Sequence, residues 1–228
     1  MSISSEMARR TRSADVGATV RGVLLSPKTG FAGAFRRIDA TPEKPSSYLL
    51  AGVGGAAAML LWLKVSGLFG LREGAAGGFR WSIFLPLLVL SGLVAVLARA
   101  LWSVAAPRVA GPEAASPRTF RAVWSLSSFP QVAVVLVLLP LDLILVGGKA
   151  FTAEPIGDSV STAWAALSTA IALSLSVWSG AVFFRGVEAA GRASLGRSAA
   201  IAGLAVASVV VVVAVAGFAL VALKGAGG

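Results

Sequence analysis

The chain has 228 residues, of which 57% are apolar and 13% are charged, and its formal net charge is +10. A soluble domain carries about 25% charged residues, so this composition would leave large apolar patches exposed to water. The chain contains no cysteine and no histidine, which excludes disulfides, thiol and imidazole catalysis, and the usual zinc, haem and iron–sulfur sites. We therefore expect an all-α, polytopic integral membrane protein that needs no cofactor or metal and is not an enzyme.

The predicted elements begin with an N-terminal region that precedes the first apolar segment. Residues 1–15 are basic and lack an apolar pattern, so we expect them to be disordered. Residues 16–44 form an amphipathic segment in which Phe31, Phe35 and Ile38 recur at helical spacing beside Arg36 and Arg37. Such a pattern predicts helices that lie on the cytoplasmic membrane surface, with the aromatic face in lipid and the arginines against anionic headgroups or a partner.

Five nearly uncharged segments follow, and each provides or approaches the roughly 20 residues that cross a bilayer as a helix. They lie at about 45–63, 81–102, 130–147, 159–184 and 198–223, so the transmembrane domain covers residues 45–224. No internal repeat is visible. Five spans also cannot divide into two equal halves, which counts against an inverted-repeat transporter.

The third segment needs its own description because it contains two prolines. Residues 124–129 are polar enough to lie at the membrane interface, and Pro130 fits the first turn of a helix. Pro140 lies inside the span, where its ring removes a backbone hydrogen bond and predicts a kink. Tryptophans near the predicted span ends are typical of the headgroup region; they are Trp62, Trp81, Trp102 and Trp124.

Basic residues between the spans predict the orientation. The N-terminal region and the loops after the second and fourth spans hold 15 Lys and Arg residues, counting Arg99, whereas the opposite side holds 5, counting Lys64. Cytoplasmic loops collect Lys and Arg, so we expect the N-terminus in the cytoplasm of a bacterial cell and the C-terminus outside its plasma membrane. The same bias accounts for the positive net charge without a nucleic-acid partner.

Apart from Arg99, which is counted with the loop at the end of the second span, Asp142 is the one charged residue within a predicted span. A charge at the middle of the bilayer costs about 2.5–3.5 kcal/mol on insertion scales, so such residues are candidates for function. By the predicted span it lies about five residues, or roughly 7.5 Å, from the outer helix end. One interpretation is a structural carboxylate that pairs with Lys149 or a serine hydroxyl. The other is a proton or cation site that faces the interior of the bundle.

Small residues mark two predicted packing faces. The first span contains Gly52 and Gly55, and the fourth contains a stripe at four-residue spacing: Ser168, Ala172, Ser176 and Gly180. Small residues allow close helix approach, and serines can form hydrogen bonds across the interface. We expect both helices to be well packed. A polar substrate path along the serines is the alternative.

Several short motifs follow one another along the chain: VLLSPKTGF at residues 23–31, FRRI at 35–38, FRAVW at 120–124, Phe129 with Pro130, Trp178, and Gly186 before a short basic loop. In this order they resemble the Yip family domain of Ypt/Rab-interacting membrane proteins. The resemblance covers about residues 22–222. The resemblance implies a cytoplasmic N-terminus, five spans and no catalytic residues. It also implies a role beside other membrane proteins, since bacterial members are often taken to assist membrane complexes such as exporters.

Two functions remain open. The first is a membrane scaffold or accessory subunit of a larger complex. We expect its partners to be anionic lipids of the cytoplasmic leaflet together with either a membrane protein or a second copy of the chain. The second is a small transporter or channel that uses Asp142 and the serines of the fourth span. An embedded enzyme lacks an acid, base and nucleophile in a recognisable arrangement.

Overall fold

The computed structural model describes residues 21–27, 30–31, 34–35, 45–68, 79–152 and 156–226. This part of the chain is almost entirely helical and contains no strand. The long helices are α3 (Pro45–Leu68), α4 (Trp81–Ala110), α8 (Ser159–Gly191) and α9 (Leu195–Ala226). Between α4 and α8 lie α5 (Pro117–Ser127), α6 (Gln131–Ala133), the π-helical η1 (Val134–Leu138), α7 (Leu139–Leu145) and the 3₁₀-helical η2 (Gly147–Phe151).

The described helices confirm the predicted all-α polytopic architecture. Four of them are long and apolar enough to cross a membrane on their own, over Pro45–Gly67, Trp81–Ala110, Ser159–Gly191 and Leu195–Ala216. The pair Pro117–Ser127 and Gln131–Leu145 makes a fifth span if both are counted as one, with a bend of 45° between them. The chain is thus a multi-pass membrane protein. Lipid is the natural surrounding for its exposed apolar side chains, which are numerous on α4 and α9.

The third span differs in detail from the prediction. Its bend lies at the turn over residues 128–130, which separates the amphipathic α5 from α6. At Pro140, which follows the first residue of α7, the preceding helix widens into η1. A proline cannot donate its backbone hydrogen bond and its ring crowds the preceding turn, and a π-helical turn accommodates both.

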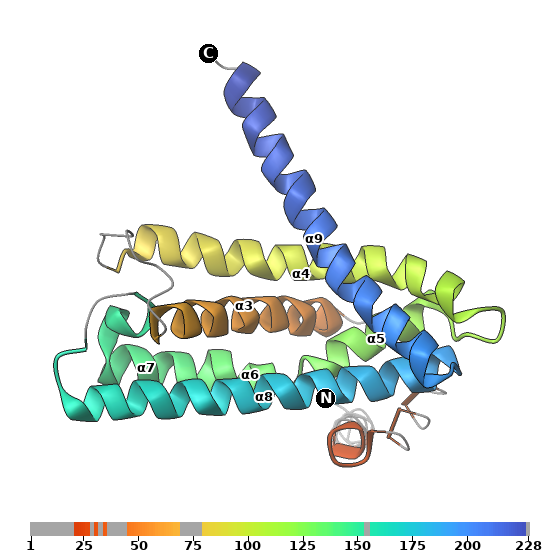
Figure 1. Ribbon diagram of the computed structural model, residues 1–228, viewed down its shortest axis with the longest axis horizontal. Helices are drawn as coiled ribbons and strands as arrows, with labels where there is room; N and C mark the ends of the chain where they lie inside the picture. Colours follow the sequence, from red (N-terminus) through yellow and green to blue (C-terminus); the bar gives the residue numbers. More distant parts are fainter. Residues whose placement is uncertain are drawn as a thin grey trace, which may run out of the picture.

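The helices form a bundle in which α3 is central (Figure 1). Helix α3 lies between α4 on one side and α7 and α8 on the other, whereas α9 crosses α4 at a steep angle and continues away from the bundle. Glycines allow the close approach of α3 to α4. A Cβ atom built on Gly55 would lie 2.4 Å from the carbonyl oxygen of Ser91, and one on Gly92 would lie 3.1 Å from that of Gly52. The predicted packing role of Gly52 and Gly55 is therefore visible in the backbone geometry.

Two buried apolar clusters lie towards the two ends of the bundle. One surrounds Trp102 and Phe120, and the other surrounds Leu60, Phe84 and Leu138. Trp102 is fully buried, and its Nε1 donates a hydrogen bond to the carbonyl oxygen of Ile201 in α9 (2.9 Å). The headgroup position predicted for Trp102 is thus wrong, because α4 continues to Ala110 and places this ring between helices. Trp62 and Trp81 are more than half exposed, as a position facing the membrane requires.

Phe31 also lies in the first cluster rather than in lipid. It is fully buried and packs beside Gly186 of α8, where a Cβ would come within 2.8 Å of its ring. Phe35 is partly buried against the same cluster and lies 5.5 Å from Phe31 between ring centroids. The aromatic residues at this spacing therefore attach the N-terminal segment to the bundle. Arg36, Arg37 and Ile38, the other residues of the predicted surface, lie outside the described part of the chain.

Candidate functional site

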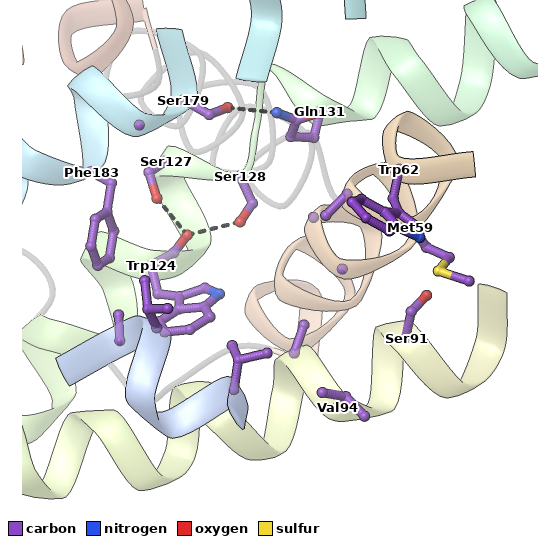
Figure 2. Close-up of a pocket in the computed structure, with 18 of the residues that line it drawn as sticks. Met59, Trp62, Ser91, Val94, Trp124, Ser127, Ser128, Gln131, Ser179 and Phe183 are labelled. Carbon is purple, nitrogen blue, oxygen red and sulfur yellow. Dashed lines mark hydrogen bonds between the residues drawn. The ribbon is translucent and has the colours of Figure 1, made fainter. Parts of the chain in front are cut away.

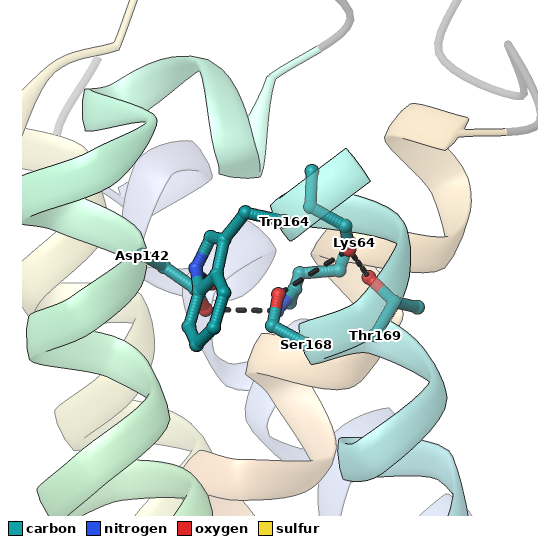
Figure 3. A network of polar contacts seen from close by, with 6 residues as sticks. Lys64, Asp142, Trp164, Ser168 and Thr169 are labelled. Atoms are coloured by element: carbon teal, nitrogen blue, oxygen red, sulfur yellow. Dashed lines mark hydrogen bonds and ion pairs between the residues drawn. The ribbon is translucent and has the colours of Figure 1, made fainter. Parts of the chain in front are cut away.

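Asp142 belongs to a buried polar network that joins three helices (Figure 3). Its Oδ2 accepts a hydrogen bond from Nζ of Lys64 at 2.8 Å, and its Oδ1 accepts one from Nε1 of Trp164 at 3.1 Å. Lys64 also donates to Oγ of Ser168 at 2.7 Å. The side chains of Lys64 and Asp142 are 3% and 2% exposed, so the two charges neutralise each other inside the protein.

The partner of Asp142 differs from both predicted candidates. Lys149 lies in η2, after the span has ended, and Ser168 bonds to Lys64. Lys64 was assigned to the outer flank of the first span, but α3 continues to Leu68 and keeps this lysine in the bundle. The sequence does contain a signal for the pair. Spans one and three run in the same direction, so residues near their C-terminal ends lie at a similar depth.

The network fixes α3, α7 and α8 relative to one another. Both charges come from residues near the ends of their helices, where a helical rise of about 1.5 Å per residue places Lys64 roughly 6 Å from the end of α3. Lys64 and Asp142 each have a second hydrogen-bond partner besides the other. A buried ion pair needs such additional hydrogen bonds to offset the cost of removing both charges from water. This arrangement matches the structural interpretation of Asp142, with a different partner. Two cavities in the described part of the bundle have neither Lys64 nor Asp142 in their lining.

A second buried cation lies towards the opposite end of α3. Arg99 of α4 is 1% exposed; its Nε donates to the carbonyl oxygen of Arg121 at 3.1 Å, and one terminal nitrogen donates to Oγ of Ser47 at 3.2 Å. The guanidinium also lies 4.7 Å from the ring centroid of Tyr48. Arg99 was counted with the loop at the end of the second span, and this was wrong because α4 continues to Ala110. It ties α3, α4 and α5 together, as Lys64 ties α3 to α7 and α8.

Between these two ends lies an open groove of about 600 Å³ (Figure 2). Helices α3, α4, α8 and α9 and the α5–α6 turn form its walls, and its lining includes no charged residue. Several lining side chains are strongly exposed, so the groove opens sideways towards the membrane. The lining residues include Gly54, Ala58, Trp62, Val94, Gln131, Gly180, Ala205, Val206 and Val213.

Polar groups gather along one side of this groove. Ser127 and Ser128 both donate their hydroxyl hydrogens to the carbonyl oxygen of Trp124, at 2.8 and 3.0 Å. Nε2 of Gln131 contacts Oγ of Ser176 at 3.1 Å and Oγ of Ser179 at 3.3 Å. Gln131 is 7% exposed, and its Oε1 is buried without a hydrogen-bond partner. Sequence reasoning missed Gln131, although it is a strongly polar residue directly after the start of a span.

The serine stripe of the fourth span divides between the network and the groove. Ser168 and Ala172 are buried, the first against Lys64 and the second in the apolar cluster around Leu60. Ser176 bonds to Gln131, whereas Gly180 lines the groove and a Cβ built on it would meet no atom within 4 Å. The stripe is thus a packing face for most of its length, and its last residue faces open space.

The described residues contain no cluster of His, Cys, Asp or Glu that could hold a metal ion. No family model, curated protein or solved structure matches the chain.

Proposed function

We propose that the protein is an accessory or scaffold subunit that holds another membrane component in the groove between α3, α4, α8 and α9. The observation that carries this proposal is the groove itself. It is an uncharged, laterally open depression whose central wall, α3, is held by buried polar contacts towards both of its ends. A concave surface that faces lipid favours binding of an apolar element from within the membrane.

The transport alternative has less support. It needs Asp142 to face a path for a substrate, and Asp142 is instead neutralised by Lys64 with both of its oxygens hydrogen bonded. Ser168 and Ser176 of the serine stripe also form hydrogen bonds within the protein. Binding in the groove requires none of these groups to move.

The proposed setting is the plasma membrane of a bacterium, with the N-terminus in the cytoplasm. Lys64 and Arg99 are buried within helices and do not count as loop charges, which leaves 14 basic residues on the N-terminal side and 4 on the other. The excess of basic residues therefore still lies on the side of the N-terminus, which favours a cytoplasmic N-terminus. Membership of the Yip family, proposed from the residues that resemble it, agrees with a role beside other membrane proteins.

Photocrosslinking in native membranes tests the proposal. A photoreactive amino acid at Val94, in the groove wall, should yield a discrete crosslinked product, and Gly180→Leu should remove it by filling the groove. Gly203→Leu is the matched control, because Gly203 is also a helical glycine whose added Cβ would meet nothing within 4 Å, but it does not line the groove. A product that survives Gly180→Leu, or no product at Val94, would refute binding in the groove.

A further inference from the structure

The unpartnered oxygen of Gln131 gives the groove a specific chemical requirement. Ser176 donates its hydroxyl hydrogen to the carbonyl oxygen of Ala172 at 2.8 Å, so its Oγ can only accept from Gln131. That contact fixes Nε2 of the amide towards α8 and turns Oε1 away from it. The free group is therefore an acceptor, and it lacks a donor. A buried acceptor without a donor is unfavourable in a protein interior, and more so within a membrane.

The depth of this acceptor limits what can supply the donor. Ala58, which lines both cavities with Gln131, lies about 20 Å along α3 from Pro45 and about 15 Å from Leu68 at 1.5 Å per residue. Gln131 is thus close to the middle of the span. Lipid headgroups lie at the membrane surface, and the groove lining contains no cation that would attract a phosphate. A polar side chain on a transmembrane helix, in contrast, can lie at any depth.

The walls of the groove are long enough for two turns of a helix and expose small residues. The lining runs from Gly54 to Trp62 on α3 and from Ala205 to Val213 on α9, about 12 Å in each case, or just over two helical turns. Ala58 is exposed and Gly180 has open space above its Cα, so a neighbouring backbone can come close at both positions. Small residues at such positions are typical of helix–helix contacts in membranes.

From these observations we infer that the groove binds a transmembrane helix of another protein, and that this helix donates a hydrogen bond to Oε1 of Gln131 from a Ser, Thr, Asn or Gln near its midpoint. The inference rests on the proposed function, since it names the partner class for the same groove. The donor side chain sets the register of the helix, and small residues on either side of it contact Ala58 and Gly180.

Model peptides in proteoliposomes test this inference with the full-length chain. The probes are two Lys-flanked Leu/Ala transmembrane peptides that are identical except for a central Asn or Leu. The chain has no cysteine, so Leu93→Cys, an exposed position of α4 that precedes the groove residue Val94, can carry a donor fluorophore. Energy transfer to labelled peptides should show that the Asn peptide binds about threefold to tenfold more tightly than the Leu peptide, the range expected of one interhelical hydrogen bond.

Variants then separate the two levels of the proposal. Gln131→Leu should remove the preference for Asn and retain binding of the Leu peptide, whereas Gly180→Leu should weaken binding of both peptides and Gly203→Leu should not. Equal binding of the two peptides to the wild-type chain would overturn the assignment of Gln131 while leaving the groove as a binding site. Transfer between two labelled copies of the chain that Gly180→Leu abolishes would assign the groove to self-association and overturn the inference. Energy transfer to neither peptide above the random background, with lipid retained by the purified protein, would assign the groove to lipid and overturn the inference as well.

Discussion

The ion pair of Lys64 and Asp142 should show strong energetic coupling although it adds little net stability. At 2.8 Å, two unit charges attract by about 6 kcal/mol at an effective dielectric constant of about 20. Desolvation of each ion opposes this by several kcal/mol, so the two effects nearly cancel. Removal of one partner leaves the other charge buried. Lys64→Met and Asp142→Leu should therefore each lower the free energy of unfolding by about 3–5 kcal/mol.

The double variant Lys64→Met/Asp142→Leu should lose far less than the sum of the two single changes. It contains no buried charge, and its remaining defect is Nε1 of Trp164, which loses its acceptor at a cost of about 1–3 kcal/mol. Unfolding by SDS in mixed micelles, followed by tryptophan fluorescence, measures all four proteins. Lys149→Met is the control, since it removes a lysine charge outside the span and should change stability by less than about 0.5 kcal/mol. A double variant that loses the full sum of the single effects would refute the reasoning.

Three further predictions concern packing, pH and topology. Gly186→Ala should destabilise the protein by about 1–3 kcal/mol, because the new Cβ would lie 2.6 Å from Val123 and 2.8 Å from Phe31. Gly203→Ala, whose Cβ would enter open space, should be neutral or stabilising. Thermal unfolding of both variants measures the difference. The backbone N–H of Ser161 donates to the carboxylate of Asp158 and lowers the pKa of that carboxyl. The stability that this cap gives α8 is therefore fully present above the ordinary aspartate pKa of about 3.9 and is lost as pH falls through the lowered pKa. Hydrogen exchange at the start of α8 should then increase in the wild type but not in Asp158→Asn. Single cysteines at positions 2 and 227 should react differently with an impermeant maleimide in intact cells, with only position 227 labelled; labelling of position 2 would reverse the proposed orientation.

The spans could be predicted because the length of an apolar segment is a local property of the sequence. Composition placed the chain in a membrane, and the starts of α3, α4 and α8 agree with the predicted spans to the residue. Helix ends were predicted less well. A Lys or Arg reads as the end of a span in a sequence, but Lys64 and Arg99 find partners inside the bundle and their helices continue. Pairing between distant helices is invisible to a local pattern.

The candidate site could be predicted only in part, for a related reason. Asp142 stands out because a charge in an apolar segment is conspicuous. Gln131 carries no charge and lies beside Pro130, so it looks like part of the interface, and only the bend between α5 and α6 brings it against Ser176. Phe31 has the spacing of a lipid-facing residue, but the same spacing serves for packing on α8 beside Gly186. Periodicity identifies an apolar face without identifying what covers it.

The width of the groove depends mainly on α9. Helix α3 is held by Arg99 towards one end and by Lys64 near the other, so its position relative to α4, α7 and α8 is determined by contacts that are costly to break. Helix α9 is attached near its start, where Ile201 accepts the hydrogen bond from Trp102. Beyond Ser208 its described side chains, among them Val210, Val211 and Val215, are largely exposed. The wall formed by Val206 and Val213 therefore rests on fewer contacts than the opposite wall, and an entering helix would replace lipid on α9 without breaking either buried charge contact.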